Sequence, residues 1–129
     1  MNSATNMIDV PLREIAHGRT GDKGDRANIS IIPYEPAGFA FIADQLTAAK
    51  MRDAFAHRGV GKVTRYDLPA LGAFNFVLDN VLQGGVNGSL NLDGHGKSLS
   101  FIAMSIPVRV PSELVESARK ARRTEDSSV

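Results

Sequence analysis

The chain is most informative at residues 17–28, which read His17-Gly18-Arg19-Thr20-Gly21-Asp22-Lys23-Gly24-Asp25-Arg26-Ala27-Asn28. Three glycines separate polar side chains of both charge signs here, and apolar sequence ends at Ile15 and resumes at Ile29. Glycine lets the backbone turn sharply, so we expect a polar loop. Binding residues concentrate in loops that a rigid scaffold carries.

The segments on either side of this loop predict strands. Residues 10–17 alternate after an edge-like Pro11, and residues 27–33 alternate Ala27 and Ile29 with polar neighbours. We therefore expect an antiparallel pair with the polar loop at its tip.

Helices and a third strand are predicted next. Apolar residues at spacings of three and four predict a helix that starts at Pro36, and Thr47 is a candidate N-cap for a second helix over 48–57. A strand over 62–68 ends at Pro69. A helix over 71–82 follows, with an apolar stripe of Leu71, Phe74, Leu78 and Leu82.

The C-terminal third predicts a short strand at 89–92, a turn at Asp93-Gly94 and a long strand at 97–107. That last strand is apolar on both sides, as in a strand covered on both faces. Since the helices can cover one face only, we expect a second subunit on the other and hence a homo-oligomer. The fold class is α+β: a two-layer sandwich with two helical units on one face of a mostly antiparallel sheet of four to five strands.

Composition limits the possible functions. The 129 residues indicate one domain, expected at 8–110, with frayed termini at 1–7 and 118–129. The chain has no cysteine, which excludes disulfides, thiolate catalysis and cysteine-ligated metals. A net charge of +1 attracts neither nucleic acid nor membranes. We find no signal sequence and expect a cytoplasmic protein.

Three stretches resemble the small ferredoxin-like domain of the acyclic terpene utilisation (AtuA-like) family. They are Leu12–Asp25, Tyr66–Leu78 and Leu92–Leu99, and the resemblance covers about residues 10–108 in the same order. It implies a ferredoxin-like fold and a role near the degradation of branched acyl-CoA compounds. In that family the domain occurs alone or joined to a larger domain, so a larger AtuA-like or acyl-CoA enzyme subunit is the expected partner. The resemblance implies no particular cofactor.

Two interpretations of the polar loop stay open. In the functional one, Arg19 and Lys23 bind a carboxylate, phosphate or thioester oxygen, and the backbone N–H groups of Gly21 and Gly24 form an anion-binding nest. An aspartate orients the cations and His17 moves a proton. In the structural one, Arg–Asp pairs simply staple a hairpin tip, although exposed pairs stabilise by only about 0–1 kcal/mol.

Two later residues can join the site. A buried amide at Asn75 needs a hydrogen-bond partner: either Asn75 pairs with the first loop, or it caps the junction between strand and helix. Lys97 follows the Asp93-Gly94 turn, and either it faces the same ligand as the first loop or it is solvated beside a hairpin turn. We predict no metal site, because two aspartates are few ligands for a cation. The predicted catalytic residues are His17, Asp22, Lys23 and Asp25, and the predicted ligand-binding residues are Arg19, Thr20, Gly21, Gly24, Asn28, Asn75 and Lys97.

Three functions fit this sequence. The first is a small subunit or accessory domain that completes the site of an acyl-CoA-processing hydratase, lyase or hydrolase in branched-chain or terpenoid acid catabolism. The second is a binding module for an anionic metabolite, without turnover. The third is a structural dimerisation domain.

Overall fold

The computed structural model describes residues 6–23, 26–56, 60–79 and 95–127. Its elements follow the chain as β1 (Met7–Pro11), the 3-10 turn η1 (Leu12–Glu14), β2 (Ala16–Lys23), β3 (Arg26–Pro33), α1 (Gly38–Gln45), α2 (Ala48–Ala54), β4 (Val63–Leu68), β5 (Ala73–Leu78), α4 (His95–Met104), β6 (Pro107–Pro111) and α5 (Ser112–Ser127).

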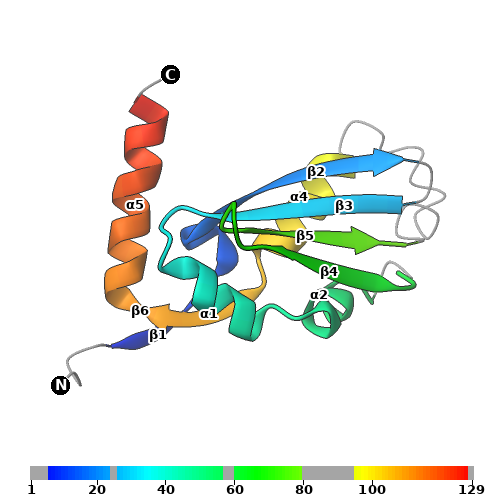
Figure 1. Ribbon diagram of the computed structural model, residues 1–129, viewed down its shortest axis with the longest axis horizontal. Helices are drawn as coiled ribbons and strands as arrows, with labels where there is room; N and C mark the ends of the chain where they lie inside the picture. Colours follow the sequence, from blue (N-terminus) through cyan, green and yellow to red (C-terminus); the bar gives the residue numbers. More distant parts are fainter. Residues whose placement is uncertain (1–5, 24–25, 57–59, 80–94, 128–129) are drawn as a thin grey trace.

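The strands form two antiparallel sheets. The larger has the order β2-β3-β5-β4, and the smaller pairs β1 with β6. Figure 1 shows α4 behind the larger sheet, α1 and α2 near its β4 edge, and α5 beyond the end of the sheet that is opposite the β2–β3 turn. This is the expected α+β arrangement, and it is consistent with a ferredoxin-like fold.

The core lies on one face of the larger sheet. Ile29 and Ile31 of β3 pair with Phe76 and Phe74 of β5, and all four side chains are fully buried. Helix α1 packs on this face, with Phe39 stacked on Phe74 at 4.5 Å between ring centroids. Helices α2 and α4 pack on it too. We call it the covered face.

Several sequence predictions are confirmed. Strands were expected at 27–33 and 62–68 and occur at Arg26–Pro33 and Val63–Leu68. Helix α2 begins after Thr47, whose Oγ1 accepts a hydrogen bond of 3.0 Å from the backbone N–H of Lys50. Strands β2 and β3 form the expected antiparallel pair.

The first predicted strand and the polar loop are both wrong in their bounds. Residues 10–17 divide among β1, η1 and β2, and β2 then continues through the predicted loop to Lys23. Strand β3 begins at Arg26, so only residues 24–25 separate the two strands. Pairing between β2 and β3 fixes Gly18 and Gly21 of the expected loop in extended backbone.

The helix predicted at 71–82 is also wrong, because Ala73–Leu78 is strand β5, which alternates buried Phe74, Phe76 and Leu78 with half-buried residues. The strand predicted at 97–107 is instead the helix α4, followed by β6 from Pro107. The argument for a second subunit on that strand is therefore removed.

Described elements reach into both segments that we expected to fray. Helix α5 runs to Ser127 where we expected fraying from 118, and Met7 belongs to β1. The predictions at 89–92 and at Asp93-Gly94 lie outside the described residues. None of the described helices combines the length and the apolar character that crossing a bilayer requires.

Candidate functional site

The second face of the larger sheet carries most of the residues that the sequence singled out. Side chains alternate along a strand, so the neighbours of the core residues lie on this opposite side, which no described helix covers. We call it the open face. Its described residues are His17, Arg19, Gly21, Arg26, Asn28, Ser30, Ile32, Thr64, Tyr66, Leu68, Ala73, Asn75 and Val77.

The strand register arranges these residues in rows across the sheet. Arg19 of β2 lies opposite Ser30 of β3, Ser30 lies opposite Asn75 of β5, and Asn75 lies opposite Tyr66 of β4. We call this set the central row. Directly opposed residues have Cβ atoms about 4.5–5.5 Å apart, so each side chain of the row touches or nearly touches the next.

A hydrogen-bonded amide pair is at the middle of the open face. The Oδ1 atom of Asn75 accepts one hydrogen bond from Asn28 Nδ2 and one from Ser30 Oγ, each 3.2 Å long. Both contacts are partly buried. Both of these bonds use the oxygen of Asn75, and within the part of the chain that the structure describes no group accepts from its two amide N–H donors.

Glycine at position 21 makes room for this pair. A Cβ atom there would lie 2.8 Å from the Oδ1 atom of Asn28, which is closer than side-chain contacts allow. Gly21 therefore permits the Asn28 amide to lie flat on the sheet and to reach Asn75. This is a different use of glycine from the backbone nest that we predicted, because Gly21 is in the strand pair and lacks the left-handed conformation.

The charges of the open face are not all neutralised within it. Arg19 is exposed and forms no ion pair with any residue that the structure describes. At one end of the face Arg26 pairs with Asp79 at 2.7 Å. At the other end the half-buried ring of His17 lies 5.2 Å from the ring of Tyr34, over which Arg122 is placed at 5.9 Å. Arg19 is thus an exposed cation in the same row as the Asn75 amide, two strands away from it.

The structure brings together five of the predicted site residues on the open face. They are His17, Arg19, Gly21, Asn28 and Asn75. The expectation that Asn75 pairs with the 17–28 segment agrees with its bond to Asn28, although Asn75 is on a strand and not on a helix.

The other predicted residues are placed elsewhere. Thr20 lies opposite the buried Ile29 and so belongs to the covered face. In the register of β2, Asp22 lies opposite Ala27 and Lys23 opposite Arg26. Lys97 is in the first turn of α4, on the covered side of the sheet. The side chains of Asp22, Lys23 and Lys97, and all of Gly24 and Asp25, lie outside what the structure describes.

Sequence reasoning missed two members of the central row, Ser30 and Tyr66. The Tyr66 residue is 52% exposed, and alternation within the correctly predicted 62–68 strand groups it with Thr64 and Leu68. The signal was therefore present, but assigning it to a site requires the strand order.

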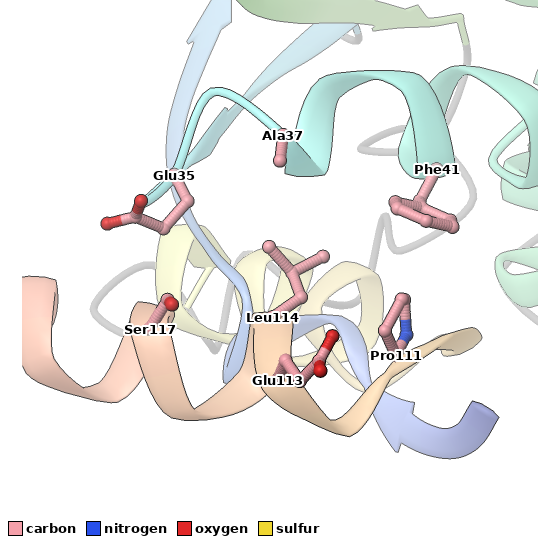
Figure 2. A pocket seen from close by; sticks show the side chains of 7 residues that line it. All are labelled: Glu35, Ala37, Phe41, Pro111, Glu113, Leu114 and Ser117. Carbon is pink, nitrogen blue, oxygen red and sulfur yellow. The ribbon is translucent and has the colours of Figure 1, made fainter. Parts of the chain in front are cut away.

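A cavity of about 230 Å³ lies elsewhere, between α1 and α5. Figure 2 shows Leu114 pointing into it from α5, while the carboxylates of Glu35 and Glu113 are on opposite sides and do not converge. Its lining is Glu35, Ala37, Phe41, Pro111, Glu113, Leu114 and Ser117. This arrangement suits neither a cation, which needs several converging oxygens, nor paired-acid catalysis. Among the described residues, no three histidine or acidic side chains are grouped as metal ligands would be.

The fold and the open face together define a class: a small α+β domain that presents one polar face of an antiparallel sheet. The family model for the AtuA ferredoxin-like domain matches residues 10–109. The chain therefore belongs to the AtuA ferredoxin-like domain family. No curated protein and no solved structure matches it.

Proposed function

We propose that this domain is an accessory subunit of an acyl-CoA-processing enzyme, of the hydratase, lyase or hydrolase type, in the catabolism of branched-chain or terpenoid acids. Its open face forms one wall of a site that a larger subunit completes. The observation that carries the proposal is the exposed guanidinium of Arg19 in one row with the Asn75 amide. Family membership supports it.

The open face is suited to binding an anionic substrate. Arg19 can donate charge-assisted hydrogen bonds to a carboxylate, phosphate or thioester oxygen. The amide donors of Asn75 are fixed by their two internal bonds, and donors fixed in advance need little reorganisation when charge arrives. His17 lies two residues from Arg19 on the same strand face, and an imidazole is suited to moving a proton near neutral pH.

The chemistry of the same face supports the proposal of a larger partner. The hydroxyl of Ser30 donates its proton to Asn75 Oδ1, so its oxygen is not paired with a general base as an activated nucleophile would be. Arg19, Asn75 and His17 bind and polarise a ligand, and the remaining chemistry falls to the larger subunit.

The test compares two exposed arginines in the full chain. Arg19 is on the open face, and Arg52 is on α2, away from that face. We expect Arg19→Gln to weaken the binding of a branched acyl-CoA, measured by calorimetry, by about tenfold or more, which corresponds to about 1.4 kcal/mol. We expect Arg52→Gln to bind as the unchanged protein does.

A second measurement addresses catalysis. Acyl-CoA turnover should coelute with the tagged protein from its native cells and should fall with Arg19→Gln but not with Arg52→Gln. Equal binding by both variants would contradict the assignment of the open face. Binding without any coeluting turnover would favour the non-catalytic binding module instead.

A further inference from the structure

Tyr66 gives the open face a feature that anion binding alone does not use. This aromatic residue is 52% exposed, it closes the central row on β4, and it lies directly opposite Asn75. An aromatic ring exposed on a sheet is a platform on which a planar base can stack. The half-buried Val77 and Thr64 form the adjacent row on the same face.

The row also has the length and polarity of a nucleotide site. Arg19 and Tyr66 are separated by three strand spacings, about 14 Å between backbones. A carboxylate or a thioester is too short to contact both ends, whereas the base, ribose and phosphates of a nucleotide can bridge them. Between the two ends, Asn75 presents amide N–H donors that suit ring nitrogens or ribose oxygens.

We propose that the central row binds the adenine nucleotide end of coenzyme A, with the base stacked on Tyr66 and a phosphate on Arg19. This inference rests on the proposed function, and it specifies which part of the acyl-CoA this domain holds. The acyl thioester then extends beyond the row toward the larger subunit. No covalent step takes place on the row itself.

The experiment is calorimetry on the full chain with adenosine 3′,5′-bisphosphate, which is the nucleotide end of coenzyme A, and with acetyl-pantetheine, which is the opposite end. Tyr66→Ala removes the platform, Tyr66→Phe keeps it, and Phe101→Ala removes a comparable aromatic that is 68% exposed on α4, across the sheet. Circular dichroism verifies that each variant is folded.

We expect the bisphosphate to bind the unchanged chain, Tyr66→Ala to bind it about tenfold less tightly, and Tyr66→Phe and Phe101→Ala to bind it within twofold of the unchanged chain. Arg19→Gln should weaken it as well. Absence of bisphosphate binding, or equal binding by Tyr66→Ala, would overturn the inference. Tighter binding of a single-stranded RNA oligonucleotide than of the bisphosphate would also overturn it, in favour of a polynucleotide site.

The two ligands and the turnover measurement together distinguish failure of this inference from failure of the proposed function. If acetyl-pantetheine binds and the bisphosphate does not, the nucleotide inference fails while the acyl-CoA role stands. If the bisphosphate binds in the Tyr66-dependent way but no acyl-CoA turnover coelutes with the protein, the nucleotide site stands and the enzymatic role fails.

Discussion

Gly18 and Gly21 are three positions apart on β2 and so lie on opposite faces of the sheet, where an added side chain would meet different neighbours. A Cβ atom at Gly18 would lie 2.9 Å from the Sδ atom of the buried Met104 on α4, on the covered face. At Gly21 it would meet the end of the Asn28 amide on the open face. Only the first neighbour is confined by a packed core.

We therefore expect Gly18→Ala to lower the free energy of unfolding by about 1–3 kcal/mol through overpacking. Gly21→Ala should lower it by less than about 1 kcal/mol, because the amide can rotate into solvent. Urea unfolding measures both. In a double-mutant cycle, the variant with both Gly18→Ala and Met104→Ala should lose less free energy of unfolding than the two single variants lose together. If the two losses simply add, Met104 is not the group that the new methyl group displaces.

Arg65 has a structural role, in which one guanidinium contacts a helix end, a carboxylate and an aromatic ring. Its Nη1 donates to the carbonyl oxygens of Ala43 and Leu46 at 2.8 and 3.0 Å, its Nε lies 2.8 Å from Asp67, and its guanidinium is over the ring of Phe74 at 5.4 Å. It thereby satisfies carbonyls at the end of α1, which a helix leaves unpaired.

Replacing Arg65 by Lys keeps the charge but loses the planar fork that serves both carbonyls and the carboxylate. We expect a loss of about 1–3 kcal/mol in the free energy of unfolding. Asp67→Asn is the matched control: the Asp67 side chain is 43% exposed, so we expect a loss below about 1 kcal/mol. Equal losses would show that the ion pair, and not the helix contact, holds Arg65.

At the scale of elements, the start of α2 depends on one side chain. Thr47 has extended backbone, and its hydroxyl accepts from Lys50 N at 3.0 Å. Thr47→Ala should cost about 1 kcal/mol of stability, and Thr47→Ser should cost only a few tenths, because serine keeps the capping oxygen. Thermal unfolding of the three proteins measures this order, and an equally harmful Thr47→Ser would indicate that the methyl group matters more than the cap.

Elements were predictable where one periodicity dominates. Strand β3 and the capped helix α2 are examples. In β5, Phe74 and Leu78 fit a helical spacing, but Phe74, Phe76 and Leu78 also fit strand alternation. The turn before it, where Gly72 has φ of 64°, separates the exposed Leu71 from the stripe to which we assigned it. Short apolar runs do not distinguish the two periods.

Helix α4 shows the opposite error: its apolar run predicted a strand, but it forms a helix. Leu99 and Ala103 are buried one helical turn apart, while Phe101 between them is 68% exposed. A strand would have put Leu99, Phe101 and Ala103 on one face. Nothing local in this apolar run favours the helix, so its packing against β2 decides the outcome.

For the candidate site, the sequence predicted several of the residues but not the backbone conformation that carries them. The residues of 17–28 were recognised from their chemistry, yet the glycines among them indicated a loop. Gly18 faces Met104, which is far along the chain, and Gly21 faces Asn28 across the strand pair. These close contacts, which require glycine, exist only in the folded molecule. The sequence alone therefore favours the commoner explanation for a glycine, which is a turn.

On the scale of the whole molecule, the two faces of the larger sheet have separate tasks. The covered face buries the aromatic and aliphatic core beneath α1, α2 and α4, and the open face carries the polar rows. Because the core lies on the covered face, we expect substitutions of exposed side chains on the open face to change the free energy of unfolding little, so that a change in binding by the Arg19 and Tyr66 variants would report on the proposed site.

Gln45, at the end of α1, links that helix to the smaller sheet through Arg109 of β6. Its side-chain amide donates to the carbonyl oxygen of Arg109 at 2.7 Å and accepts from the backbone N–H of Arg109 at 2.7 Å, so it occupies the free edge of β6 as a neighbouring strand would. Because β6 pairs only with β1 in its sheet, this clamp ties that small sheet to the helices of the covered face.

We expect Gln45→Ala to release β1 and β6 locally. Native-state hydrogen exchange should accelerate for the paired backbone of β1 and β6, while β3 and β5 should keep their protection, since parts of a domain can open with different free energies. The overall loss of stability should be about 1–2 kcal/mol for two hydrogen bonds. Asp44→Ala, at the exposed neighbouring position, should change neither pattern. Uniform acceleration across both sheets would instead mean that they open as a single cooperative unit, with Gln45 contributing to the global transition.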